Sequence, residues 1–102
     1  MVRLRLDAKA DRQELIMKAS MRLSARIGFS NITRETLAKE AECSEALITY
    51  HYGTMKNLRR DIMRYAVRTK NLRVVAQGLA IENPYARKAP EELKQRALGA
   101  LA

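Results

Sequence analysis

The stretch from Thr33 to Tyr52 constrains the fold of this chain more than any other feature. It reads TRETLAKEAECSEALITYHY and predicts two short helices joined by a tight turn at Glu42-Cys43. Thr33 and Ser44 each stand directly before a helical stretch, where a hydroxyl side chain caps free backbone N–H groups. Gly53 suits the position just after the second helix. Helices this short are not stable alone in water, so both must pack on a third.

The residues before this stretch predict that third helix. An apolar pattern at helical spacing runs from Ala8 to Ile27, and Gly28 ends it. Phe29 and Ile32 are expected to fill the core beside the following helix. The face expected to be buried contains Leu15, Ile16, Ala19, Leu23 and Ile27.

The rest of the chain predicts one long and one short helix. The long helix is expected from Met55 to about Gly78, with an apolar stripe at Leu58, Ile62, Tyr65, Ala66, Thr69, Leu72 and Ala76. Asn83-Pro84 breaks the chain, because proline disfavours helix at the residue before it. Pro90 fits the first turn of the short helix, whose apolar face is Leu93, Ala97 and Leu101. No strand is predicted, so the fold class is all-α.

The charge of the chain points to a polyanionic partner. Twenty Lys and Arg against eleven Asp and Glu in 102 residues give +9, which suits nucleic acid or an anionic membrane; a basic protein with neither partner is the alternative. A membrane is the weaker candidate, since no apolar run approaches the roughly 20 residues of a spanning helix. The N-terminus lacks the apolar segment of a secretion signal, so a cytoplasmic location is expected.

Together the residues around the two short helices resemble the DNA-binding domain of the TetR family. The residues that carry the resemblance are Gly28-Phe29, Thr33, Leu37-Ala38, Ala41, Ser44, Ala46, Ile48, Tyr50-His51-Tyr52 and Leu58. Four positions depart from the family pattern: Glu42 replaces the usual turn Gly, Thr49 a Tyr, Met55 a Lys and Ser24 a Phe.

The resemblance implies a three-helix helix-turn-helix head, TetR- or homeodomain-like, over residues 11–58. It further implies a homodimer that binds double-stranded DNA at a pseudo-palindromic operator and represses transcription by blocking promoter access. Residues 1–10 would be a basic N-terminal arm, and residues 59–102 a helical extension for dimerisation. The family's large ligand-binding domain is absent, and no small-molecule inducer site is evident. The chain is then either truncated or a compact regulator of the kind that phages and mobile elements use.

The second short helix is the expected reader of bases. In a helix-turn-helix the N-terminal part of this helix enters the major groove. Ile48 and Tyr52 are four residues apart and are expected to face inward. The residues this helix offers to DNA are Glu45, Ala46, Leu47, Thr49 and Tyr50. Glu45 could accept from cytosine, or it could only favour the helix N-terminus electrostatically. Tyr50 could instead be a half-buried aromatic residue.

Phosphate contacts are expected at the helix ends. Thr33, Thr36 and Ser44 stand in first turns, with Arg34 beside them and Lys56 opening the next helix. The resemblance also makes Arg34, Tyr50 and His51 contact positions. The alternatives are a satisfied surface histidine for His51 and a solvated helix end for Lys56.

Two further basic blocks flank this motif. Arg3, Arg5, Lys9 and Arg12 could follow the minor groove or form a solvated tail. The long helix carries Lys56, Arg59, Arg60, Arg64, Arg68, Lys70 and Arg73, of which the first three are nearest the motif; a solvated surface is the alternative.

No catalytic, metal or cofactor site is predicted. Cys43 and His51 are the single Cys and the single His, so neither an intrachain disulfide nor a structural zinc site is expected.

Two other functions remain open. One is a DNA-packaging or architectural module, such as a small terminase-like subunit. The other is a protein–protein adaptor with a degenerate helix-turn-helix, whose later helices bind an acidic partner. The residues expected at a dimer surface are Tyr65, Val67, Leu72, Val75, Leu79, Leu93, Leu98 and Leu101.

Overall fold

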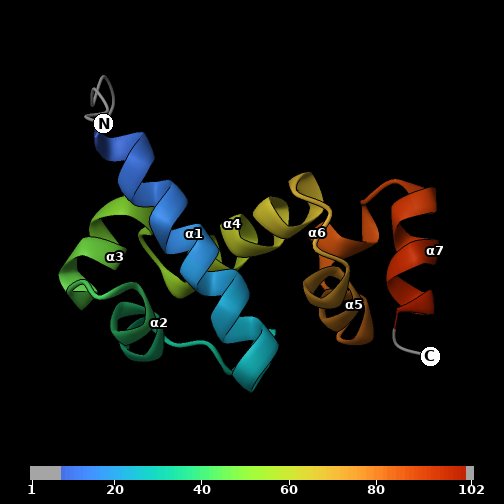
Figure 1. Ribbon diagram of the computed structural model, residues 1–102, viewed down its shortest axis with the longest axis horizontal. Helices are drawn as coiled ribbons and strands as arrows, with labels where there is room; N and C mark the ends of the chain where they lie inside the picture. Colours follow the sequence, from blue (N-terminus) through green and yellow to red (C-terminus); the bar gives the residue numbers. More distant parts are fainter. Residues whose placement is uncertain (1–7, 101–102) are drawn as a thin grey trace, which may run out of the picture.

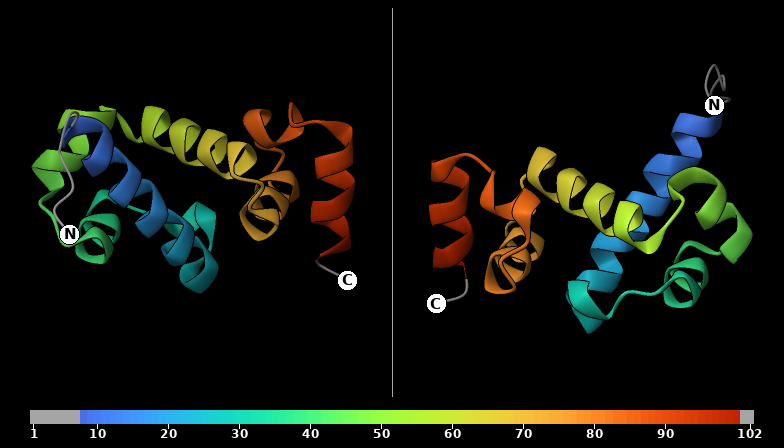
Figure 2. Two further views of the ribbon diagram at one scale, coloured as in Figure 1. Left: turned by 45° about the horizontal axis from the view of Figure 1, so that its top comes forward. Right: turned by 180° about the vertical axis from the view of Figure 1, so that it is seen from behind.

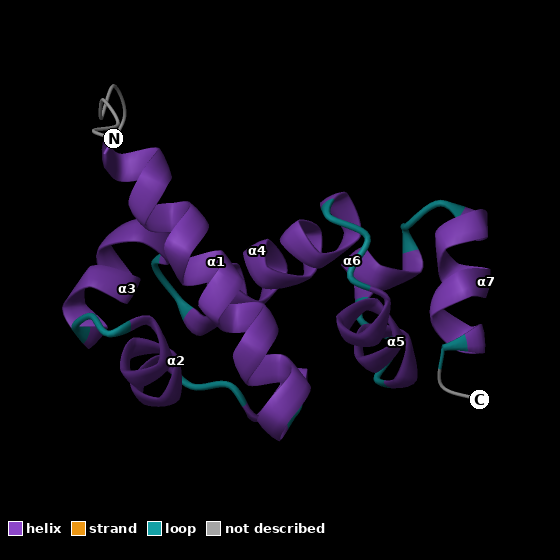
Figure 3. Cartoon of the chain, viewed as in Figure 1, coloured by secondary structure: helices purple, strands orange, loops and turns teal. Residues whose placement is uncertain are grey.

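The computed structural model describes residues 8–100, and within that range the chain is helical with no strand (Figures 1 and 3). The all-α fold class is therefore confirmed. The elements are α1 (Ala8–Ile27), the 3-10 turn η1 (Phe29–Asn31), α2 (Arg34–Ala41), α3 (Glu45–Tyr52), α4 (Met55–Arg68), α5 (Leu72–Ala80), α6 (Pro84–Arg87) and α7 (Glu91–Gly99).

The bounds predicted for the first three helices are confirmed, and their caps explain why. The Thr33 hydroxyl accepts from the Thr36 backbone N–H at 3.1 Å, while the Thr36 hydroxyl accepts from the Thr33 N–H at 2.9 Å. This reciprocal pair is a capping box, which satisfies two N–H groups at the start of α2. The Ser44 hydroxyl accepts from the Leu47 N–H at 3.0 Å and begins α3 in the same way.

Three helices end at a left-handed residue that is not glycine. Glu42, Lys70 and Glu82 each have φ of 57°, after α2, α4 and α5 respectively. The N–H of the residue after each one bonds to a carbonyl five residues back, at 2.8–2.9 Å: Cys43 to Ala38, Asn71 to Ala66 and Asn83 to Gly78. These are Schellman-type ends, which satisfy the last helical carbonyls.

The single long helix predicted from Met55 to about Gly78 is wrong, because two helices occupy that stretch. α4 ends at Arg68, where Lys70 turns the backbone left-handed. The Asn71 side chain then accepts from the Val74 N–H at 3.1 Å and begins α5. Thr69, placed in the predicted apolar stripe, is exposed, and its hydroxyl donates to the Tyr65 carbonyl at 2.8 Å.

Gly78 lies inside α5 and does not end a helix. A Cβ at this position would lie 2.8 Å from the Cβ of Ala86 and 2.5 Å from the Cε of Met63. The glycine therefore lets α4, α5 and α6 approach closely. Packing between helices therefore requires glycine at this position. The sequence alone had suggested that Gly78 ends a helix.

The predicted single short helix is also incomplete, since α6 precedes α7. α5 already ends at Ala80, before Asn83-Pro84. The Asn83 side-chain oxygen accepts from the N–H groups of Tyr85 and Ala86, and so Asn83 caps the start of α6. Pro90 is the N-cap of α7, one residue earlier than expected. Of the predicted apolar face, Leu93 and Ala97 are buried, and Leu101 lies outside the described residues.

The molecule is elongated, with extents of 40 × 30 × 21 Å. α2 and α3 lie at one end of the long axis and α5, α6 and α7 at the other, with α4 running between them (Figures 1 and 2). On α1, Leu15 was expected in the core but is 62% exposed, and Met17 is buried instead. At about 100° per residue, the buried residues of α1 from Ile16 to Ser24 gather on one side of the helix, and Leu15 lies outside that side.

Hydrogen bonds join α5 to the end of α1 and to η1. The Gln77 side chain of α5 accepts from the Phe29 N–H at 2.8 Å and donates to the Ser24 carbonyl at 3.1 Å. The boundary predicted between residues 58 and 59 falls inside α4. The predicted arm over residues 1–10 also overlaps α1 from Ala8 onward, and its residues 1–7 lie outside the described residues.

Candidate nucleic-acid interface

α3 is fixed to the rest of the molecule through the two residues predicted to face inward. Ile48 is fully buried and Tyr52 nearly so, which confirms the predicted orientation of this helix. The Tyr52 hydroxyl also donates to the Gln13 carbonyl of α1 at 3.2 Å. Burial raises the pKa of Tyr52 above its usual value, with the nearby carboxylates of Asp61 and Glu14 as smaller causes. α3 is thereby held across α1.

The opposite side of α3 is open to solvent. Glu45, Ala46, Thr49 and Tyr50 are exposed, and the Tyr50 side chain is 72% exposed. Leu47 was expected among them, but it is half-buried. It directly precedes the fully buried Ile48 and so lies at the border of the inward face. We call Glu45, Ala46, Thr49 and Tyr50 the exposed row of α3; it begins with a carboxylate and ends with an aromatic ring.

The hydroxyl groups predicted to bind phosphate are engaged as caps within the protein. Thr33 and Ser44 are exposed, whereas Thr36 is half-buried within the capping box. Each cap satisfies part of a first helical turn, whose N–H groups have no partner inside the helix. The starts of α2 and α3 therefore both retain the partial positive charge of a helix N-terminus.

Arg34 spans the two helices of the motif. Its Nη2 donates to the Gly53 carbonyl at 3.1 Å, which joins the first residue of α2 to the residue that follows α3. The side chain is half-buried, and its Nε has no hydrogen-bond partner among the described residues. Arg34 therefore helps to fix the angle between α2 and α3.

His51 lies beside a cavity and apart from the exposed row. Its ring is half-buried, and neither ring nitrogen contacts solvent or a hydrogen-bond partner within residues 8–100. It lines a cavity of about 560 Å³ between α1, α3 and α4, together with Glu14 and Arg64. Burial lowers the pKa of His51, and the charges of Lys9 and Arg12 lower it further.

Lys56 places a positive charge at the start of α4, close to the end of α3. Lys56 is exposed and forms no ion pair with a carboxylate in the described part of the chain. The helix itself begins at Thr54, whose hydroxyl accepts from the Asn57 N–H at 3.1 Å. The threonine before Met55 was a usable N-cap signal that sequence reasoning had not singled out.

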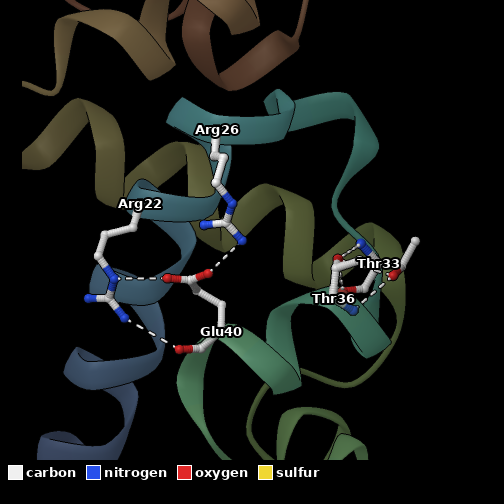
Figure 4. A network of polar contacts seen from close by, with 5 residues as sticks. All are labelled: Arg22, Arg26, Thr33, Thr36 and Glu40. Atoms are coloured by element: carbon white, nitrogen blue, oxygen red, sulfur yellow. Dashed lines mark hydrogen bonds and ion pairs between the residues drawn. The ribbon is translucent and has the colours of Figure 1, made fainter.

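An ion-pair cluster joins α1 to α2, and the sequence did not reveal it. Arg22 Nε donates to one carboxylate oxygen of Glu40 at 3.0 Å, and Arg26 Nη2 lies 2.8 Å from the other (Figure 4). The hydrogen bond from Arg26 and then that from Arg22 hold the pKa of Glu40 below its usual value. Arg22 and Arg26 are one turn apart on α1, but nothing in the sequence identified their partner.

Several residues expected at a dimer surface are buried in the monomer. Tyr65, Val75 and Leu93 belong to its core, which corrects that expectation. The remaining candidates are the half-buried Val67, Leu72 and Leu79 and the exposed Leu98, while Leu101 lies outside the described residues. Ile81, which was not predicted, is 50% exposed, as is Leu98.

The described residues also bear on membrane, metal and thiol chemistry. No helix there is long and apolar enough to cross a membrane. No group of three or more His, Cys, Asp or Glu side chains in residues 8–100 could hold a metal ion. Cys43 is half-buried against the core, and burial raises the pKa of its thiol. It is therefore a poor thiolate nucleophile.

No family model, curated protein or solved structure matches this chain.

Proposed function

We propose that this protein binds double-stranded DNA in a sequence-specific manner by placing α3 in the major groove. In this proposal it is a TetR-like transcriptional repressor that acts in the cytoplasm, at the nucleoid. It would bind a pseudo-palindromic operator as a homodimer and block access to a promoter. The proposal assigns no cofactor and no small-molecule inducer.

The observation that carries the proposal is the orientation of α3. Ile48 is fully buried while Tyr50, two residues later, is 72% exposed. An α-helix fits the major groove, where each base pair has a distinct pattern of donors and acceptors. Thr49 and Tyr50 could contact bases through a methyl group and a ring with a hydroxyl. α3 contains no Arg or Lys, so readout would depend on apolar contacts and on DNA shape.

Phosphate binding would come from the edges of the motif. The starts of α2 and α3 present helix N-termini, which favour anions. Lys56 lies exposed at the start of α4. Arg34 uses one N–H group on the Gly53 carbonyl, and the other Nη N–H groups of its guanidinium could bind a phosphate at the same time. We therefore assign it both a positioning role between α2 and α3 and a phosphate contact.

The dimer contact would lie at the end of the molecule away from α3. Leu98 and Ile81 are both 50% exposed there, and the half-buried Leu79 lines a hollow with Leu98. Glu82, Glu91, Arg87 and Lys94 surround these apolar side chains. A surface with both signs of charge can pair with its own copy across a two-fold axis.

Salt dependence tests the proposal directly. If five to eight phosphates are neutralised per dimer, log K should fall against log[salt] with a slope of roughly −5 to −7. Fluorescence anisotropy with labelled duplex DNA over a range of salt concentrations measures this slope. A slope near zero would exclude DNA binding through charge.

Tyr50→Ala separates the recognition helix from general charge. We expect this change to weaken operator binding by about tenfold or more, with little change in unfolding free energy, because the side chain is largely exposed. Leu15→Ala is the matched control, since it removes a similarly exposed large side chain from α1. Equal effects of the two changes on DNA affinity would contradict the assignment of α3.

A further inference from the structure

A continuous groove follows α4 on the side covered by α6 and the start of α7. It consists of three hollows of about 330, 260 and 370 Å³. The first two share Tyr85, and the second and third share Val67, Arg68 and Pro90. The groove therefore extends along α4 from Lys56, near the helix-turn-helix, to Lys70 beyond its C-terminal end. We call it the α4 groove.

The rim of the α4 groove is cationic. Its positive side chains include Lys56, Arg59, Arg64, Arg68, Lys88 and Arg96. None of these six forms an ion pair with a carboxylate in the described part of the chain. Among the described residues, Glu92 at the far end is the sole carboxylate that lines the groove. The positive charge is therefore not neutralised within the protein, and it favours an acidic ligand.

The floor of the α4 groove is apolar and aromatic. It contains the half-buried Val67 and Tyr85 and the buried Leu93, with the exposed Pro84 and Pro90 beside them. One of the rim cations lies over a tyrosine ring of the groove: Lys88 Nζ is 5.6 Å from the centre of the Tyr85 ring, which lines the first two hollows. Tyr85 is only partly buried, so a ligand can contact its ring.

A cationic rim over an apolar floor selects one kind of partner. A phosphodiester backbone would satisfy the rim and one base could stack on Tyr85, but the other apolar lining residues are aliphatic and offer no further stacking surface. An extended or helical peptide that alternates acidic and large apolar side chains satisfies both. The length of the groove also suits a segment of chain better than a small molecule.

We propose that the α4 groove docks an acidic, amphipathic peptide segment of a partner protein. The middle hollow, between Arg64, Val67, Tyr85 and Lys88, receives the apolar side chains of that segment, and the cations on the rim bind its carboxylates. This surface is separate from the exposed row of α3 and shares only Lys56, at its near end, with the proposed DNA contacts. A DNA-bound copy could therefore recruit a second protein through its α4 groove.

Two labelled peptides test the chemistry of the groove in the full chain. The probe alternates Asp-Glu with Leu-Phe pairs, and its control has Gly-Ser in place of Leu-Phe at the same length and charge. We expect fluorescence anisotropy to show binding of the probe about tenfold tighter than the control. Equal binding of the two peptides would overturn the proposal, because charge alone would then explain it.

Two charge reversals test the location. Lys88→Glu changes the rim, and Lys18→Glu makes the same change at an exposed lysine on α1, outside the groove. Probe affinity should fall by about fivefold or more for Lys88→Glu and change less than about twofold for Lys18→Glu. Thermal melting checks that both variants are folded. Equal losses in the two variants would overturn the location.

A third experiment tests whether the α4 groove binds DNA instead of a peptide. Lys88→Glu should weaken the probe much more than it weakens labelled duplex DNA of random sequence. If DNA binding falls as much as probe binding, the groove is a nucleic-acid track and the peptide proposal is overturned. This result is distinguishable from failure of the DNA-binding proposal, in which the unmodified chain would show no salt-dependent DNA affinity.

Discussion

The two ends of this molecule build their cores in different ways. Around α1, α2 and α3 most of the buried side chains are large, including Leu23, Phe29, Ile32, Leu37 and Ile48. Around α5, α6 and α7 many of the buried positions are alanine or glycine: Ala76, Gly78, Ala86, Ala89 and Ala97. Large side chains hold helices apart and fill the space between them, whereas small residues bring backbones close together.

This difference predicts opposite sensitivities. The core of the first end loses contacts when a large side chain is truncated, because a cavity remains. The core of the second end has fewer large side chains to truncate, but at Gly78 it cannot accommodate an added methyl group without a shift of its neighbours. Substitutions of individual residues can test this contrast, and their expected effects differ widely in size.

Ile48→Ala should have the largest effect, a loss of about 2–5 kcal/mol in the free energy of unfolding. Ile48 is fully buried between α3 and the rest of the core. Leu15→Ala is the control, because Leu15 is 62% exposed and its truncation should change stability by no more than about 0.5 kcal/mol. Urea unfolding followed by circular dichroism measures both. A larger loss for Leu15→Ala than for Ile48→Ala would mean that α1 is packed differently.

Gly78→Ala should destabilise the second end by about 1–3 kcal/mol, despite alanine's higher helix propensity. The new Cβ would lie 2.8 Å from Ala86 Cβ, and Met63 would also have to move. Gly99→Ala is the matched control, because nothing lies within 4 Å of its added Cβ. That control should be neutral or stabilising. A stabilising effect of Gly78→Ala would refute the close packing of α4, α5 and α6.

Glycine at the left-handed positions should stabilise both ends to a similar, smaller extent. Glu42→Gly and Lys70→Gly each relieve a φ of 57°, for a gain of up to about 1 kcal/mol after glycine's entropic cost. Lys18→Gly, in the middle of α1, should instead lose about 0.5–1 kcal/mol. Thermal melting of the three variants measures the difference. Destabilisation by Lys70→Gly would argue against the break between α4 and α5.

Acid should reveal the smallest effect, the contribution of the Glu40 cluster. The folded pKa of Glu40 is lowered from 4.5, so its contribution to stability is complete above that pH and is lost as pH falls through the folded pKa. The melting temperatures of the wild type and Glu40→Gln should therefore differ at neutral pH and converge in acid.

Glu91→Gln is the matched variant at the other end. Hydrogen bonds from Gln95 and Lys94 within α7 also lower the pKa of Glu91, but its side chain is more exposed than that of Glu40. We expect a weaker pH effect there, because water screens it and no second helix is joined. A larger acid effect for Glu91→Gln than for Glu40→Gln would contradict this comparison.

The ends of α1, α2 and α3 could be predicted because their signals are local. Thr33, Ser44, Gly28 and Gly53 act within a few residues of their own positions, through hydroxyl caps and backbone conformations available to glycine. The break at Lys70 carried a weaker signal. A left-handed lysine is uncommon, and the one cue was Asn71, an N-cap residue directly before α5. Apolar residues continued on both sides of it, so periodicity favoured one helix.

In the candidate site, too, local features could be predicted from the sequence and contacts between distant residues could not. The 3.6-residue period predicts that Ile48 faces inward and that Thr49 and Tyr50 face out. It could not show that Arg34 donates to the Gly53 carbonyl or that His51 lies beside a cavity, because both depend on partners distant in sequence.

Local signals in the sequence were enough to predict the all-α class, the bounds of the first three helices and the inward side of α3. Caps and periodicity act over one or two turns, and so the amino-acid order specifies them directly. The three-dimensional packing was needed to show where α4 ends, why Gly78 is glycine, which side chain Arg22 and Arg26 share and how α6 forms a groove along α4. Each of these depends on contacts between helices, where close packing, rather than local preference, sets the conformation.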